Sequence, residues 1–420
     1  MPRFIFFFTL ILVLIAGCAA PSLPGAQPTP LVPDQPTPAG VDTPAPVPTS
    51  PPASPTVRVA QPTVTAEPPT EVPERPPGWI AYIGVDENLW LVNPDTGEQR
   101  QLTQDAIPLE SDAQKETIRY CCAQWSSDGR LLAYRREAGS RESDGFQYQF
   151  DLWVFDLVSG DARAVLENLQ VAGYAWRPGT HLIAYGLPIA LEYFISRGEP
   201  AAELAEGIWA VDADAGSPYE LVPPERGFSI ISPKWSRDGR FLAFEEMLYM
   251  EGRGKFAYYD FEAQQYVAWD DVIGSYDWSP DGEAIAYDRM VYTPIGTERI
   301  WLNNRQGDAE QAFSPENEQG YAFNPVFSPQ GDRLAYLAEL SGVPDTLQYT
   351  LFVQPYQNGE PRELGVFEQT YDPAWSPDGE RLALSSGPFE DRQVFVVDVA
   401  GGSVEVLAEG TQPAWQPVSP

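Results

Sequence analysis

A repeated phrase of eleven residues constrains the fold of this chain more than any other feature. One copy, AWSPDGERLAL, begins at Ala374, and variant copies follow the same pattern along the chain. The repeated aromatic residue stands at Trp125, Trp176, Trp235, Trp278, Phe327, Trp375 and Trp415. These positions are 51, 59, 43, 49, 48 and 40 residues apart. Such a period, without the three- and four-residue apolar spacing of helices, predicts the blades of a β-propeller.

The last complete copy shows how one unit is built. A short strand ends at Trp375, residues 376–379 form a turn, and further strands are predicted over 381–384, 394–398 and 404–407. Proline presets the second turn position, aspartate bonds nearby backbone and glycine accepts a positive φ, so SPDG favours a tight type I turn. Besides the aromatic residues, this structural role is assigned to Asp128, Gly129, Asp238, Gly239, Asp281, Gly282, Gly331, Asp378 and Gly379.

The first and last units are incomplete in complementary ways. Residues 79–82, 88–92 and 100–103 match the second, third and fourth strands of a unit, whereas residues 414–415 match a first strand with nothing after it. We therefore expect the C-terminal strand to pair with the N-terminal blade and close the ring, because closure removes exposed sheet edges. The prediction is an all-β fold, a single seven-bladed propeller over residues 79–420, with six blades as the alternative.

The repeated motif resembles a known family signature. W-S-P-D-G followed by an I/L-A-Y/F strand is similar to the PD40, or WD40-like, repeats of TolB-type propellers, and the ending P-A-W-x-P is also TolB-like. The resemblance covers about residues 79–420. It implies a propeller that acts as a binding scaffold or as an appendage to a peptidase. The chain departs from a TolB protein in its predicted blade number and in the absence of a separate α/β domain ahead of the propeller.

The N-terminal residues predict a targeting signal and a linker rather than a folded domain. Residues 4–16 form an apolar run that is too short to span a bilayer and has the length of a signal-peptide core. The run ends in Ile-Ala-Gly-Cys, which resembles a bacterial lipobox and implies lipidation of Cys18. We expect residues 1–17 to be a lipoprotein signal peptide and residues 18–78, rich in proline and threonine, to be a disordered linker. The predicted location is extracytoplasmic, in the periplasm or at the bacterial cell surface, lipid-anchored to the cell membrane or the outer membrane.

Composition excludes several classes of function. The formal net charge is −34, so a phosphate backbone would be repelled and nucleic acid is not an expected partner. His181 is the only histidine, which excludes a histidine-rich metal site, and it is expected to be structural. No serine lies in a G-x-S-x-G elbow. We assign no catalytic residue, no metal and no cofactor. Cys121 and Cys122 are interpreted as two buried thiols, with a vicinal disulfide as the alternative.

Unequal connections point to one face of the ring as the binding face. In a four-stranded blade the first and third turns lie on one face, here called the SPDG face. The second turn and the link to the next blade lie on the other, here called the long-connection face. The long insertions, at 104–120, 136–150, 186–206 and 313–324, all belong to the second kind. Because loops on rigid scaffolds commonly carry function, the candidate ligand-face residues are Phe146, Tyr148, Glu192, Tyr193 and Phe194.

The favoured hypothesis is a non-catalytic scaffold that holds a protein, peptide or glycan on the long-connection face, with the membrane contacted through the lipid anchor alone. Acidic residues in the long loops favour a cationic, sugar or peptide ligand. The alternative is a carboxylate-based glycan hydrolase or lyase in the propeller funnel, and a third hypothesis is a purely structural envelope protein. Two carboxylates about 5–9 Å apart in a closed pocket favour the enzyme. The face assignment fails if the deepest pocket opens on the SPDG face.

Overall fold

The computed structural model describes residues 78–109, 114–142, 145–187, 205–247, 254–291, 297–315, 320–339, 347–357, 359–388 and 391–417. The predicted signal peptide, Cys18 and the linker up to residue 77 lie outside these residues. The described residues belong to one compact unit. Within the described part of the chain, no helix has the length and hydropathy needed to cross a membrane.

The regular structure of the described residues consists of β-strands in consecutive groups. The N-terminal groups contain β1 (Ile80–Gly84), β2 (Leu89–Val92), β3 (Gln99–Gln101); β4 (Glu116–Trp125), β5 (Leu131–Glu142), β6 (Gly145–Asp156), β7 (Ala162–Leu166); and β8 (Gly173–Trp176), β9 (Leu182–Gly186), β10 (Ile208–Asp212), β11 (Tyr219–Val222). The central groups contain β12 (Ser229–Trp235), β13 (Phe241–Met247), β14 (Gly254–Asp260), β15 (Gln265–Val272); and β16 (Tyr276–Trp278), β17 (Ala284–Val291), β18 (Thr297–Asn304), β19 (Gln311–Ala312). The C-terminal groups contain β20 (Tyr321–Phe327), β21 (Arg333–Glu339), β22 (Gln348–Pro355), β23 (Arg362–Glu368); and β24 (Tyr371–Trp375), β25 (Arg381–Ser386), β26 (Gln393–Asp398), β27 (Val404–Trp415).

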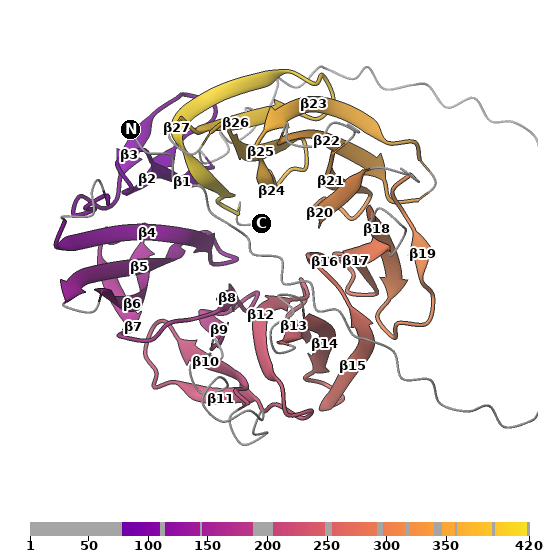
Figure 1. Ribbon diagram of the computed structural model, residues 1–420, viewed down its shortest axis with the longest axis horizontal. Helices are drawn as coiled ribbons and strands as arrows, with labels where there is room; N and C mark the ends of the chain where they lie inside the picture. Colours follow the sequence, from indigo (N-terminus) through magenta and orange to yellow (C-terminus); the bar gives the residue numbers. More distant parts are fainter. Residues whose placement is uncertain are drawn as a thin grey trace, which may run out of the picture. The chain divides into compact units, whose positions relative to one another are not determined.

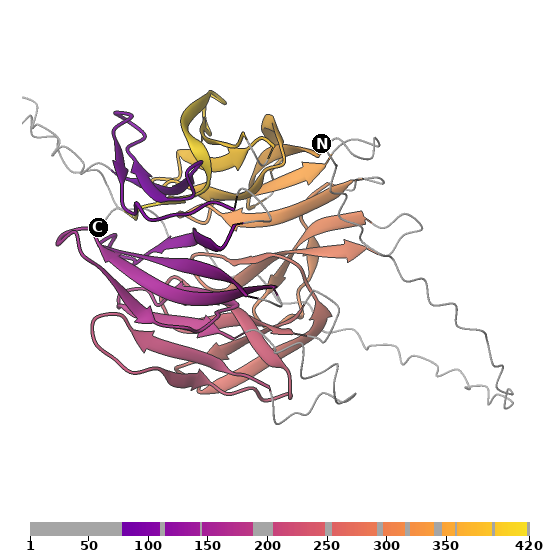
Figure 2. The same ribbon diagram turned by 60° about the vertical axis from the view of Figure 1, so that its left-hand side comes forward.

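These groups are antiparallel sheets arranged around a ring, as the sequence predicts for a propeller. Strands β8, β12, β16, β20 and β24 lie toward the centre, and β3, β11, β15 and β23 lie toward the rim (Figure 1). Figure 2 shows successive sheets packed face against face. The buried clusters form between neighbouring sheets; in one of them Leu131 and Leu152 pack with Trp176 and Tyr185 of the next group. Burial of these faces is the main stabilising term of the ring.

Strand β27 closes the ring in the way the incomplete units predict. Its first half pairs with β26, and its second half pairs with β1, with Trp415 opposite Ile80 and Gly410 opposite Gly84. Gly410 is required at the junction, because a Cβ there would meet the Ile83 carbonyl oxygen at 2.3 Å. With β27 counted in both of its groups, the described strands make seven four-stranded units.

The repeated tryptophan fastens each sheet to the one before it. The indole Nε1 donates to the backbone carbonyl of the residue that precedes the equivalent aromatic residue in the preceding group. The five pairs are Trp125–Ala414 (3.1 Å), Trp176–Gln124 (3.0 Å), Trp278–Lys234 (3.1 Å), Trp375–Val326 (3.0 Å) and Trp415–Ala374 (3.0 Å). The indole nitrogen of Trp235 has no such partner among the described residues, and Phe327 has no indole. The aromatic residue therefore links sheets rather than facing a ligand.

The SPDG turns are built by their own side chains. In the turn after Trp375, Ser376 Oγ donates to Asp378 Oδ1 at 2.6 Å and accepts from the Arg381 amide at 2.9 Å. The same serine–aspartate bond measures 2.5 Å at Asp128, 2.6 Å at Asp238 and 2.5 Å at Asp281. The turn glycines have φ of 69° to 75°, which favours glycine; they are Gly129, Gly239, Gly282, Gly331 and Gly379. The structure thus places these residues in turns.

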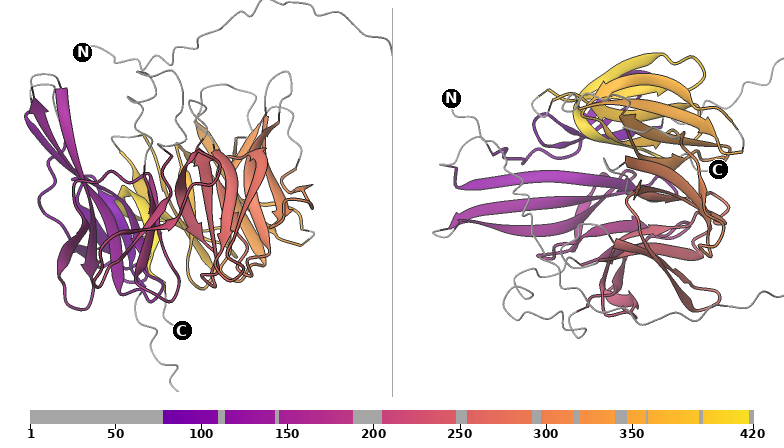
Figure 3. Two further views of the ribbon diagram at one scale, coloured as in Figure 1. Left: turned by 90° about the horizontal axis from the view of Figure 1, so that it is seen from below. Right: turned by 45° about the vertical axis from the view of Figure 1, so that its right-hand side comes forward.

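The segment 136–150, expected to be a loop, is instead a continuation of the hairpin β5–β6. Arg136 pairs with Asp151, and the ladder continues to Glu142 opposite Gly145. This hairpin rises beyond the ring in the left-hand view of Figure 3, where it is coloured purple. The loop prediction was therefore wrong for residues 136–142 and 145–150. The sequence Asp144-Gly145 is a hairpin-turn signal and could have predicted the strands.

Candidate functional site

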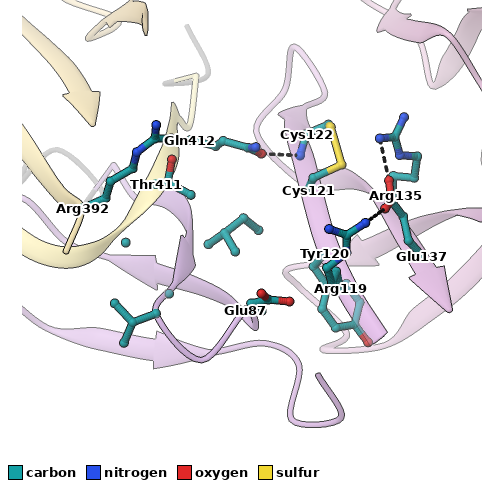
Figure 4. Close-up of a pocket in the computed structure, with 14 residues that line it drawn as sticks. Glu87, Arg119, Tyr120, Cys121, Cys122, Arg135, Glu137, Arg392, Thr411 and Gln412 are labelled. Carbon is teal, nitrogen blue, oxygen red and sulfur yellow. Dashed lines mark hydrogen bonds and ion pairs between the residues drawn. A yellow bond between two sulfur atoms is a disulfide. The ribbon is translucent and has the colours of Figure 1, made fainter. Parts of the chain in front are cut away.

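A pocket of about 530 Å³ lies where the closing strand meets the first two groups of strands (Figure 4). Its wall is formed by the end of β1 and the β1–β2 turn, by β4 and β5, by Arg392 just before β26, and by β27. Its polar and ionisable lining residues are Glu87, Arg119, Tyr120, Arg135, Glu137, Arg392, Thr411 and Gln412. These positions lie at the strand ends that lead into the long-connection face, and no SPDG turn residue lines the pocket. The pocket therefore lies on the long-connection side of the ring.

The turn between β1 and β2 presents Glu87 to the pocket. The turn is closed by backbone hydrogen bonds from the Gly84 amide to the Asn88 carbonyl and from the Glu87 amide to the Gly84 carbonyl, both 2.9 Å. Glu87 has a φ of 58°, a conformation uncommon for glutamate. Its Oε2 atom is buried and has no hydrogen-bond partner among the described residues. Burial raises the pKa of this carboxyl group, and Arg119 opposes the shift without cancelling it.

A carboxylate and two guanidinium groups form a network on the β4–β5 wall. Glu137 accepts a hydrogen bond from Arg119 Nη2 at 2.9 Å and forms an ion pair with Arg135 Nη2 at 2.6 Å. Arg392, just before β26, lies across the pocket from them (Figure 4). The pocket thus brings three arginines together with two glutamates, within a chain whose net charge is −34. The expectation of an acidic binding face does not describe this pocket. The acidic loop residues behind that expectation lie mainly outside the described residues.

Adjacent cysteines form part of the pocket wall. Cys121 and Cys122 are joined by a disulfide bond (Figure 4). The Cys122 amide donates to Gln412 Oε1 at 2.7 Å, and its carbonyl accepts from the Tyr174 hydroxyl. The interpretation as two buried thiols was wrong, because a bulge in β4 with φ of 65° at Cys122 brings the two side chains to the same wall.

The bulge recurs at the same place in several copies of the repeat, although the residues at that place share no common type. Positive φ values also occur three residues before the repeated aromatic at Ser232 (53°), Asn324 (52°) and Gln412 (57°). These strands lie nearest the ring centre, and each has a register shift at this position. The residue three positions before the aromatic therefore lies in a bulge of the inner strand in four copies of the repeat.

A thiol count tests the cysteine pair. The Cys18→Ser variant, denatured without reductant, is expected to show no maleimide-reactive thiol, and two after reduction. Mass spectrometry of the labelled protein gives the count directly. Two reactive thiols before reduction would contradict the disulfide.

The residues chosen from the long loops do not line this pocket. Tyr148 is 40% exposed on the β5–β6 hairpin and borders a separate hollow of about 430 Å³. The backbone of Phe146 pairs with Arg141 in that hairpin, and its side chain lies outside the description. Glu192, Tyr193 and Phe194 lie outside the described residues altogether. The residues of the 530 Å³ pocket, called the central pocket below, were missed because most of them come from strands and from one short turn.

His181 lies in a network away from the pocket. Its Nδ1 atom is 2.6 Å from Asp214 Oδ2, and its Nε2 atom is 3.2 Å from Asp128 Oδ2 in the neighbouring SPDG turn. Burial lowers the pKa of the imidazole, but the hydrogen bonds to Asp214 and Asp128 outweigh burial and raise it above its usual value. The histidine thus joins two groups of strands, as expected of a structural residue.

The pH dependence of stability tests this network. The folded-state pKa of His181 lies above its unfolded value of about 6.5. The contribution to the free energy of unfolding is therefore full below the unfolded pKa and is lost as the pH rises through the folded pKa. Wild type is expected to exceed His181→Gln in stability more at about pH 6 than at about pH 9. Because His181 is the sole histidine, its NMR titration needs no assignment; Asp214→Asn should lower the measured pKa, and an unchanged pKa would contradict the network.

The metal-ligating residues give no candidate metal centre in the described ranges. No group of three or more histidine, cysteine, aspartate or glutamate side chains there is arranged to hold a metal ion. The chemistry available in the pocket is that of two carboxylates, three guanidinium groups, hydroxyl and amide groups, and a disulfide.

The ring of sheets and its pocket define a β-propeller with a polar site on the long-connection face. The family model described as PD40, TolB beta propeller domain, matches residues 208–420, and the chain belongs to this family. The family resemblance drawn from the WSPDG copies is therefore confirmed.

Individual relatives share the fold at low identity. The uncharacterized peptidase YuxL of Bacillus subtilis (strain 168) is 26% identical over 188 residues, covering 43% of this chain and 25% of that protein. An oligogalacturonate lyase in complex with manganese matches with a TM-score of 0.54 at 15% identity, over 80% of this chain and 85% of that chain. A prolyl endopeptidase structure matches with a TM-score of 0.54 at 15% identity, over 77% of this chain and 46% of that chain. These structural likenesses show the fold alone.

Proposed function

We propose that this protein is an extracytoplasmic, lipid-anchored β-propeller that binds a protein, peptide or glycan without transforming it. The observation that carries the proposal is the pocket on the long-connection face, whose volume of about 530 Å³ falls in the usual range for ligand sites. Rigid strands supply most of its wall, as expected of a preorganised binding site. Nucleic acid is not among the proposed ligands, because a net charge of −34 repels phosphate backbones.

The carboxylates favour binding over glycan hydrolysis. A carboxylate-based hydrolase needs two carboxyl groups free to act as acid and as base or nucleophile. Glu137 accepts a charge-assisted hydrogen bond from Arg119 and is paired with Arg135 in a salt bridge. Glu87 is therefore the pocket carboxylate whose oxygen is left for a ligand.

The binding proposal is tested with glycan and peptide arrays on the purified chain. Arg392 lies in the pocket wall, and Arg392→Ala is expected to lower the affinity for the captured ligand by about tenfold or more. The matched control is Val158→Arg, since Val158 is 81% exposed in the β6–β7 turn on the SPDG face. Equal loss in both variants, or loss in the control alone, would place binding elsewhere and reject the proposal.

A hydrolase or lyase is the second candidate, favoured by one observation. The raised pKa of Glu87 suits a carboxyl group that holds a proton for a leaving group. If the pocket is catalytic, incubation with oligosaccharides should release new chain ends, and Glu87→Gln should abolish release while binding persists. Unchanged oligosaccharides after prolonged incubation with wild type would exclude this candidate.

The lipid anchor has an independent test at Cys18, which lies outside the described residues. The motif Ile15-Ala16-Gly17-Cys18 motivates the proposal. Wild type is expected to sediment with membranes and to gain the mass of its acyl chains, because more than one chain gives stable anchoring. Cys18→Ser should shift the protein to the soluble fraction. Membrane retention of the variant would disprove anchoring through this residue.

A further inference from the structure

We infer that the ligand of the central pocket is an uncharged oligosaccharide whose hydroxyl groups donate to Glu87. The inference rests on the binding function proposed above and names the ligand class for the same site. Three features carry it: the unpartnered oxygen of Glu87, the arginine and amide donors around it, and the bulged inner strands beside it.

The Glu87 side chain carries a hydrogen-bond acceptor that is unpaired among the described residues. The Asp86 carboxylate fixes the turn by accepting from the Asn88 amide at 3.1 Å, Trp90 Nε1 at 3.0 Å and Gln101 Nε2 at 3.2 Å. The turn holds Glu87 at a positive φ, with Oε2 buried and without a partner among the described residues. An unsatisfied buried carboxylate oxygen costs free energy. Because Glu87 lines the pocket, a small rotation of its carboxylate would bring this oxygen to a ligand donor that recovers the cost. A strained backbone that holds such a group commonly marks a functional position.

The pocket residues around Glu87 favour a ligand with uncharged hydrogen-bond donors. Arg119 and Arg392 line the same pocket, and Gln412 lies there with its Oε1 atom already taken by the Cys122 amide. An ammonium group on the ligand would be attracted by Glu87 but repelled by the arginines, and it could accept no hydrogen bond from them. A ligand carboxylate would be attracted by the arginines, but it has no proton to donate to Glu87. A hydroxyl group donates to the glutamate and accepts from a guanidinium, so it satisfies both sides of the pocket.

The inner strands are poorly shaped for an extended peptide. Peptides add to exposed strand edges through an unbroken row of backbone donors and acceptors. Here β4 shifts register between Cys121 and Gln124, and the pairing of β27 with β1 shifts between Thr411 and Ala414. The Cys122 amide within the first bulge is already bound by a side chain. Both edges beside the pocket are therefore interrupted, which favours a glycan over a peptide strand.

A neighbouring hollow extends the site for a second sugar ring. This hollow, of about 500 Å³, shares Cys122, Arg392, Thr411 and Gln412 with the pocket, so the two lie side by side. It adds the ring of Tyr371, which is 44% exposed. The apolar C–H face of a pyranose packs well on an aromatic ring, while Ile83 and the disulfide supply apolar surface in the first pocket. The site thus suits an oligosaccharide rather than a single sugar.

Calorimetric titration of the purified full chain tests the inference. The neutral probes are cellotetraose, maltotetraose, mannotetraose and chitotetraose; the charged probes are tetragalacturonate and a tetra-alanine peptide with free termini. At least one neutral probe is expected to bind saturably, and Glu87→Asn is expected to weaken it by about tenfold or more. Asparagine suits the positive φ, so the variant should stay folded. Glu98→Asn is the matched control, because Glu98 is exposed in the β2–β3 turn on the SPDG face.

The outcomes separate this inference from the proposed function. Failure of every neutral probe to bind overturns the oligosaccharide assignment. The assignment is also overturned if the Glu87→Asn variant unfolds like wild type and still binds a neutral probe with unchanged affinity. Binding of tetragalacturonate or of the peptide alone, lost in Arg392→Ala, also overturns it but keeps the binding function. The array experiment with Arg392→Ala and Val158→Arg decides that function separately.

Discussion

Deletion of residues 410–420 is expected to abolish cooperative folding and to cause aggregation. The deletion removes the half of β27 that pairs with β1, leaving the β1 edge unpaired. It also removes the buried Trp415 indole and the carbonyl of Ala414 that Trp125 uses. Loss of one buried tryptophan costs about 3–5 kcal/mol, and a whole domain is stable by only about 5–15 kcal/mol. Denaturant unfolding and size-exclusion chromatography give the readout.

A permuted chain supplies the control for this deletion. Residues 410–415 are moved ahead of Trp79 and joined to it by Ser-Pro-Asp-Gly-Glu, which copies the spacing from Trp375 to Arg381. The closing group would then be one continuous run of hairpins, with Trp415 again opposite Ile80. We expect the permuted chain to recover a cooperative transition and the elution volume of the wild-type protein. A deletion variant that unfolds like wild type would show that closure by β27 adds little.

Trp278→Ala is expected to destabilise the ring by about 3–5 kcal/mol, because it empties a closely packed aromatic site. Trp278 is 5% exposed and lies with its ring centroid 5.8 Å from that of Phe241 and 5.9 Å from that of Tyr258. Its Nε1 atom also donates to the Lys234 carbonyl at 3.1 Å. The midpoint of guanidinium unfolding, at constant slope, measures the change.

Trp278→Phe separates packing from hydrogen bonding. Phenylalanine occupies the equivalent position at Phe327, so the ring is accepted there, and the change removes mainly the indole donor. We expect a loss of about 1–3 kcal/mol, the cost of a buried carbonyl left without its partner. Equal losses for the alanine and phenylalanine variants would mean that the hydrogen bond, and not the packing, dominates at this site.

Local chemistry made most of the fold predictable. The SPDG turn specifies its geometry through Ser376, Asp378 and Gly379, which bond within a few residues of one another. The match between the unpaired N-terminal strands and the unpaired Ala414–Trp415 predicted closure, and the register of Ile80 with Trp415 confirms it. The β5–β6 hairpin was missed although its Asp-Gly step is a local signal.

The candidate site was not predictable in the same way. Glu87, Arg119 and Gln412 belong to no repeated motif, and the sequence gives no reason to join them. The hydrogen bond from Cys122 to Gln412 spans 290 residues along the chain. The loop residues chosen from the sequence were selected by the length of their connections, whereas the pocket lies on strands and on a short turn.

By itself, the sequence determined the repeating unit, its turns and the closure of the ring, because these depend on contacts within one unit or on two complementary half-units. Only the tertiary structure decided which charges share a pocket. Ring closure brings the β1–β2 turn, the β4 bulge and the C-terminal strand to one place, and it leaves one carboxylate oxygen of Glu87 there without a partner among the described residues. Proximity between residues distant in sequence is set by the packing of whole sheets, which no local pattern records.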